Sequence, residues 1–179
     1  MPQQISVAGV PIPSDAPLFL AVLVIHVAAG LTCVVAGVLA MLSPKRAGRH
    51  PRGGTVYYWS LVVVFISMGV LSAVRWAQDY HLFMLGALSF IAAFVGRQAA
   101  PTRTQARIRI HVIGMGLSYI LLLTAFYVDN GKHLPLWRLL PPLAYWLVPL
   151  AVGAPIMAWV LLRHPLVRGE RGVPLVPRA

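Results

Sequence analysis

The sequence predicts an all-α integral membrane protein with five transmembrane helices. Five apolar stretches are separated by loops that alternate between many and few positive charges. Hydrophobic residues make up 59% of the 179 residues and the mean hydropathy is +0.77, which is more apolar than an ordinary soluble domain. The stretches cover residues 17–42, 55–74, 80–95, 108–128 and 143–162. We expect four of these helices to form a bundle and the fifth to pack against it.

The length of each stretch decides whether it can cross a membrane. A transmembrane helix needs about 20 apolar residues to cross a hydrocarbon core about 30 Å thick. Four of the stretches meet that requirement. The third, residues 80–95, is shorter, but its flanks extend a candidate span to residues 79–99.

The first two stretches carry signals of helix packing and membrane depth. In the first, His26, Gly30, Cys33 and Gly37 follow one another at spacings of four, three and four, so they share one helix face. Small residues on such a face let a neighbouring helix approach closely. The second stretch follows a predicted cytoplasmic turn at residues 50–54, and aromatic side chains come directly after that turn, at interfacial depth.

The later stretches have clear beginnings and ends. The fourth begins near His111 and stops at Asp129-Asn130-Gly131, a typical helix end. The fifth contains Pro149 and Pro155, which predict a kink that serves either packing or a hinge. We expect no carboxylate and no lysine inside a span, which disfavours a carboxylate-driven proton pump and excludes a retinal Schiff base.

Positive charge gathers on one side of the predicted membrane. The loops after the first and third stretches and the tail at residues 163–179 are rich in arginine and lysine. The positive-inside rule therefore predicts that the N-terminal segment, residues 1–16, lies outside and that the tail lies in the cytoplasm. We assign the net charge of +11 to this topology and to contact with anionic lipid headgroups at the cytoplasmic face, not to nucleic acid.

Two segments of the chain match at fixed offsets. His50 is followed by a glycine after three residues, a tyrosine after eight and a phenylalanine after fifteen, and His111 is followed by the same residues at the same offsets. Both segments enter the membrane from the cytoplasmic side. If the match is a true repeat of two spans, a pseudo-twofold axis along the membrane normal relates the two halves. Chance similarity is the alternative, because glycine and aromatic residues are common in membrane helices.

The histidines are the candidate functional residues. Imidazoles such as those of His50 and His111, facing each other across a bundle, can bind the two axial positions of a haem b iron or hold another transition metal. Nearby arginines suit haem propionates. His26 is either a hydrogen-bonded packing residue or part of a second site or proton path. The outer His26, His81 and His133, with nearby carboxylates, could suit a divalent metal, or be ordinary interfacial residues.

The segments around these histidines resemble a family of predicted bacterial multi-span membrane proteins known as a domain of unknown function. The resemblance rests on "HVAAGLTCVVAG", "RHPRGGTVYY" and "RIHVIGMGLSYILLLTAFYVDNG", and it covers roughly residues 18–131. Family members tend to have His-Arg before the glycine, where this chain has His50-Pro51-Arg52. The resemblance implies that His26, His50 and His111 are functional residues and that the protein lies in a bacterial inner membrane. It implies no activity.

Three classes of function stay open at this point, and no motif decides whether the protein is an enzyme. The first is a small membrane redox protein that binds haem b or a metal through histidines. The second is a transporter or channel-like protein for a small solute, suggested by the glycines of the first span and the prolines of the fifth. The third is a structural or accessory subunit in an oligomer or with a partner protein.

Overall fold

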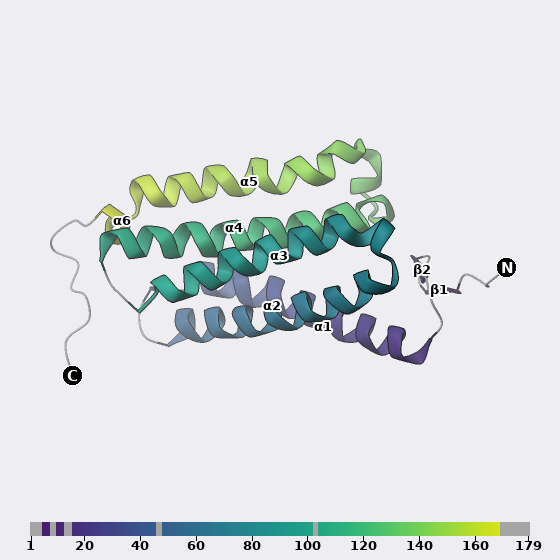
Figure 1. Cartoon of the computed structure of the whole chain (residues 1–179). Coiled ribbons are helices and arrows are strands. Elements are labelled where there is room, and N and C mark those ends of the chain that lie inside the picture. The colour runs from purple at the N-terminus through teal and green to yellow at the C-terminus, as the bar shows by residue number, and fades with distance from the viewer. Residues whose placement is uncertain (1–4, 8–9, 13–15, 46–47, 102–103, 169–179) are drawn as a thin grey trace.

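The computed structural model describes residues 5–7, 10–12, 16–45, 48–101 and 104–168. Within these ranges it contains five long helices, each apolar and long enough to cross a membrane. They are α1 (Pro17–Leu42), α2 (Arg49–Val74), α3 (Trp76–Ala99), α4 (Gln105–Asn130) and α5 (Pro142–Arg163). The prediction of an all-α fold with five candidate spans is confirmed (Figure 1).

The remaining elements are short. A two-stranded antiparallel hairpin, β1 (Ile5–Val7) and β2 (Val10–Ile12), precedes α1. The 3-10 turns η1 (Gly131–His133) and η2 (Trp137–Leu139) connect α4 to α5. A single turn, α6 (Pro165–Arg168), follows α5. The hairpin was not expected from the sequence, and most of the predicted basic tail, residues 169–179, lies outside the described residues.

The start of α2 differs from the prediction. Residues 50–54 were expected to form a turn, but α2 begins at Arg49 and the chain turns just before it, where Gly48 has a φ of 114°. Pro51 does not prevent this, because the first backbone N–H groups of a helix have no intrahelical partner in any case. His50 therefore lies in the first turn of α2, and the helix determines the direction in which its side chain points.

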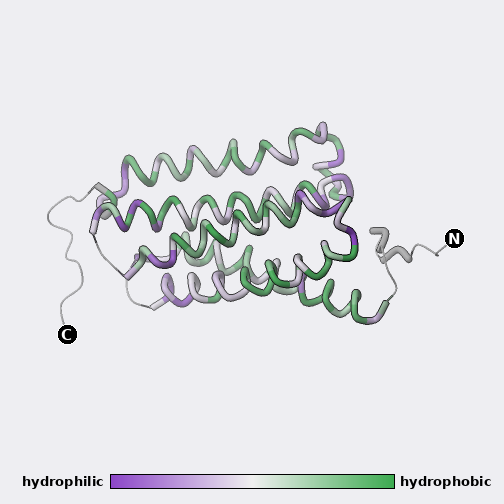
Figure 2. The backbone as a smooth tube through the Cα atoms, viewed as in Figure 1, coloured by the Kyte–Doolittle hydropathy of each residue, from purple (hydrophilic) through white to green (hydrophobic). Residues whose placement is uncertain are grey.

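The helices extend beyond the apolar stretches and include two carboxylates at their ends. Asp79 is in the first turn of α3 and Asp129 is the second-last residue of α4. α3 begins at Trp76, so the short third stretch is completed at both ends, as its flanks predicted. Hydrophilic residues concentrate toward the ends of the long helices and hydrophobic residues fill the part between them (Figure 2).

Four helices form the bundle, and α5 packs on its outside. Consecutive helices pack side by side, and the ring is closed by Tyr119 of α4, whose hydroxyl donates to the Val34 carbonyl of α1 at 3.1 Å. α5 contacts α4, where Gly153 lies against Ile120. The core between the four helices includes Cys33, Tyr57, Leu61 and Ala93, whereas most large apolar side chains on the outside are exposed and suited to lipid.

Candidate functional site

His50 and His111 face each other at the arginine-rich end of the bundle. His50 comes from the first turn of α2 and His111 from the second turn of α4. Their ring centroids are 6.1 Å apart and the ring planes are inclined at 81°, an edge-to-face arrangement. Both rings are half-buried. His111 was expected to point into the bundle with His50 close to the start of the fourth helix, and the contact of the two rings agrees with that arrangement.

Each of these imidazoles is held by one backbone carbonyl of the preceding helix. Nδ1 of His50 lies 2.8 Å from the Ala40 oxygen of α1, and Nδ1 of His111 lies 2.8 Å from the Gly96 oxygen of α3. A carbonyl oxygen can only accept, so Nδ1 carries the proton in both rings. In the neutral imidazole this leaves the lone pair on Nε2, and both Nε2 atoms are free to bind a ligand.

The carbonyl that holds His50 also accepts from a cation. The Lys45 ammonium donates to the Ala40 oxygen at 3.2 Å and to the Met41 oxygen, so it caps the end of α1. Burial lowers the pKa of this ammonium. A positive charge therefore lies beside His50. His111 has no such neighbour at the residue 56 positions after Lys45, because that residue is Pro101.

The contacts around the two histidines repeat at constant shifts in residue number. From α2 to α4 the shift is 61, as from His50 to His111, and from α1 to α3 it is 56, as from Ala40 to Gly96. With these shifts the contact of Gly53 with Ala40 corresponds to the contact of Gly114 with Gly96.

The same shifts relate the hydrogen bonds deeper in the core. Cys33 Sγ lies 3.5 Å from the backbone carbonyl oxygen of Tyr57. Its counterpart, Ser89 Oγ, donates to the backbone carbonyl oxygen of Ser118 at 2.9 Å. The ring contact of Tyr58 with Phe90 likewise corresponds to the bond of Tyr119 to Val34.

The repeat predicted from the sequence is therefore present in the packing of the helices. Chance similarity of sequence would not reproduce the same inter-helix contacts at the same two shifts. A pseudo-twofold axis exchanges corresponding residues, so corresponding residues in contact with each other lie beside that axis. His50 and His111 are such a pair, which places the axis between their rings.

A cluster of hydrogen-bonded hydroxyl groups lies deeper in the bundle interior than the histidines. The Tyr57 hydroxyl lies 2.7 Å from Ser118 Oγ, and Ser89 Oγ lies 3.2 Å from the same atom. Tyr57 is 2% exposed and is among the largest fully buried side chains. It lies seven residues beyond His50, or about 10 Å along the helix. From the sequence, Tyr57 is expected only to be one of the interfacial aromatic residues after the turn, and the small polar residues Ser89 and Ser118 are the signal for this cluster.

His26 faces protein, as expected, but it lies apart from the other two histidines. Its Nδ1 is 2.9 Å from Ser67 Oγ, and Ser67 gives its own hydroxyl proton to the Val63 carbonyl at 2.6 Å. Ser67 therefore accepts from His26. Asp129 is near enough to interact electrostatically with this histidine. The residue that corresponds to His26 in the second half is Leu82, so His26 is not part of the repeated site.

The other candidate groupings do not form among the described residues. No three or more histidine, cysteine or carboxylate side chains lie close enough together there to hold a metal ion. The outer group of His26, His81 and His133 therefore does not converge as a divalent metal site would require. His81 instead lies beside Trp146, with ring centroids 6.0 Å apart.

Comparison with known proteins adds no assignment. No family model, curated protein or solved structure matches this chain. The resemblance to the bacterial family stays a prediction. By the length and hydropathy of its helices the chain is a multi-pass membrane protein.

Proposed function

We propose that this membrane protein is a small redox protein that holds one metal centre between His50 and His111. The centre would be a transition-metal ion or the iron of haem b, since both are bound by imidazole nitrogen. One observation supports the proposal above the others. Both Nδ1 atoms donate to backbone carbonyls, and a hydrogen bond of this kind orients metal-binding histidines and leaves Nε2 free as the ligand.

The spacing of the rings agrees with this proposal. Metal–nitrogen bonds are about 2 Å long, so two nitrogens on opposite sides of one ion are about 4 Å apart. The ring centres must then be somewhat farther apart than the nitrogens, and the observed separation is 6.1 Å. A shared ion would also require both Nε2 atoms to point toward it, so at least one ring of this edge-to-face pair would have to turn. A haem would also require space for the porphyrin between α2 and α4, on the side away from the Tyr57 cluster.

The surroundings favour a centre with anionic groups. Lys45, Arg49 and Arg107 lie near the same end of the bundle as the histidines. Such cations suit haem propionates or other anionic ligands. Two neutral imidazoles without a carboxylate do not balance the positive charge of the metal. Such a site favours the lower oxidation state of a redox-active metal.

The test is the metal and haem content of purified protein. Protein purified in detergent is expected to contain one metal centre per chain by elemental analysis. A visible Soret band would identify haem, and metal without that band would identify a bare ion. His50→Gln and His111→Gln should each lose the centre, because an amide can replace the hydrogen bond but is a poor ligand for these metals.

The matched control is His26→Gln, which removes a half-buried histidine outside the pair. The His26→Gln variant is expected to have the same metal content as the wild-type protein. Size-exclusion chromatography of each variant separates loss of ligand from loss of fold. The proposal fails if the unchanged protein holds neither metal nor haem after incubation with each, or if the His50 and His111 variants bind the same amount as the unchanged protein.

A further inference from the structure

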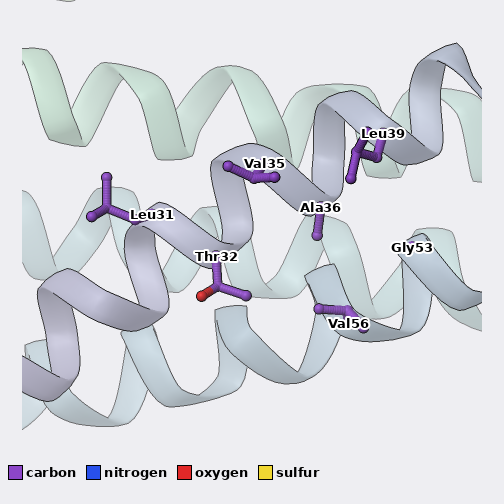
Figure 3. A pocket seen from close by; sticks show the side chains of 7 residues that line it. All are labelled: Leu31, Thr32, Val35, Ala36, Leu39, Gly53 and Val56. Carbon is purple, nitrogen blue, oxygen red and sulfur yellow. The ribbon is translucent and has the colours of Figure 1, made fainter.

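An open groove runs along the outer face of α1 and α2. One hollow, of about 420 Å³, lies between the two helices, and a second, of about 520 Å³, lies beside it on α2. The two hollows share Val56. The first is lined by Leu31, Thr32, Val35, Ala36, Leu39, Gly53 and Val56, and the second by Pro51, Arg52, Thr55 and Val56. Figure 3 shows Thr32 and Ala36 on the side of α1 that faces α2.

The pseudo-twofold repeat shows one position of this surface at which the two halves differ in what packs on them. With the shift of 61 residues, Thr55 of α2 corresponds to Gly116 of α4. A Cβ atom on Gly116 would lie 3.1 Å from Met157 Sδ, because α5 packs directly over this position. Among the described residues no helix packs in the same way on α2, and both Arg52 and Thr55 are exposed. At this one position an apolar side chain covers the second half of the repeat and the first half is open, whereas Leu88, Ile91 and Val95, the counterparts of Thr32, Val35 and Leu39, are exposed in the second half as well.

The residues that differ between the two surfaces indicate the chemistry of a ligand that can cover the open side. Arg52 replaces the Ile113 of α4, and Thr55 replaces Gly116. A cation and a hydroxyl therefore occur only on the open side. Arg52 has no ion pair within the described part of the chain, where the ion pair found is that of Arg75 with Asp79. A cover for this surface needs an apolar portion and an anionic group at one end.

The groove has the direction that such a molecule requires. Arg52 is the fourth residue of α2, so it lies near the membrane surface at the arginine-rich end. From there the groove continues past Val56 to Thr32 and Leu31, toward the middle of α1. The polar end is at the surface and the apolar end is in the hydrocarbon region.

We propose that this groove is a binding site for one anionic phospholipid. Its phosphate pairs with the guanidinium of Arg52 and accepts from the Thr55 hydroxyl, and an acyl chain lies in the hollow between α1 and α2. Charge complementarity selects an anionic headgroup over a zwitterionic one. The site is separate from the proposed metal centre and does not depend on it.

The test measures lipid binding by native mass spectrometry of the full chain released from detergent. Phosphatidylglycerol and phosphatidylcholine with the same acyl chains are the two probes. The unchanged protein is expected to retain one phosphatidylglycerol more tightly than the phosphatidylcholine. Arg52→Gln should weaken phosphatidylglycerol binding about tenfold, because a charge-assisted hydrogen bond is lost. The matched control is Arg107→Gln, which removes an exposed arginine from the same end of the bundle and should leave this binding unchanged.

A second variant tests the apolar part of the site. Thr32→Phe places a ring in the hollow between α1 and α2 and should displace the bound lipid while the protein stays monodisperse. Three results would overturn the proposal: equal loss in the Arg52 and Arg107 variants, which indicates general surface charge; equal binding of both lipids; or binding that is unaffected by both Arg52→Gln and Thr32→Phe. The last result, together with a co-purifying membrane protein lost in Thr32→Phe, would assign the groove to a partner helix.

Discussion

At the scale of single residues, buried hydroxyl groups hold the centre of this bundle together. Tyr57, Ser89 and Ser118 come from three different helices and share hydrogen bonds of 2.7 and 3.2 Å. In a membrane the apolar side chains give no hydrophobic driving force for helix association, so packing and hydrogen bonds between helices carry more of the specificity. These residues are therefore expected to determine how α2, α3 and α4 are arranged.

The first prediction concerns the Tyr57 hydroxyl. Tyr57→Phe keeps the buried ring but removes the bond to Ser118, so we expect the free energy of unfolding to fall by about 0.6 kcal/mol. Titration with sodium dodecyl sulfate in mixed micelles measures this change. Tyr80→Phe is the control, because Tyr80 is 52% exposed, and its stability should not change. Equal stability of the Tyr57 variant and the unchanged protein would show that the hydrogen bond contributes nothing net.

At the scale of helices, the hairpins α1–α2 and α3–α4 share one arrangement of contacts but differ in how closely their two helices pack. In the first hairpin Gly53 faces Ala40, and a Cβ on Gly53 would lie 3.2 Å from the Ala40 Cβ. In the second, Gly114 faces Gly96, and a Cβ on Gly114 would lie 2.7 Å from both the Gly96 Cα and the Ala92 oxygen. The second pair of helices approaches more closely because neither residue at the crossing has a side chain.

A matched pair of substitutions tests this difference. Gly114→Ala should destabilise the protein by about 1–3 kcal/mol, because the added methyl meets backbone and the helices must separate. Gly53→Ala should cost clearly less, because the nearest atom to its added methyl, the Ala40 Cβ, is 3.2 Å away, and the helices need to separate by less than at Gly114. Thermal unfolding in detergent, followed by circular dichroism, compares the two variants. If Gly53→Ala were the more damaging substitution, the assignment of the closer crossing to α3 and α4 would be wrong.

At the scale of the whole molecule, five spans carry the chain from one side of the membrane to the other. α1 begins and α5 ends at opposite ends of the bundle (Figure 1). The basic loops that follow α1 and α3 lie at the end where α5 finishes. The positive-inside rule therefore predicts a cytoplasmic C-terminus and places His50 and His111 on the cytoplasmic side.

Reporter fusions test this orientation. A fluorescent protein fused after Ala179 should fluoresce, and alkaline phosphatase fused at the same position should be inactive, because this enzyme needs disulfides formed outside the cytoplasm. Phosphatase fused after Asn130, at the end of α4, should be active. The opposite pattern at both positions would invert the topology and place the histidine pair on the outer side.

The sequence alone was enough to establish the class of protein, the five spans and the histidines that lie inward, because apolar length and helical periodicity are local properties of the chain. It also indicated the repeat through His50 and His111. It could not establish that α2 starts at Arg49, since a proline in a first turn looks like a loop signal. Only the tertiary structure brought the two rings to 6.1 Å, joined Tyr57 to Ser118, and placed α5 on one half of the repeat. These features depend on contacts between residues distant in sequence, and in a membrane the hydropathy of each helix does not determine which of its faces meets a neighbour.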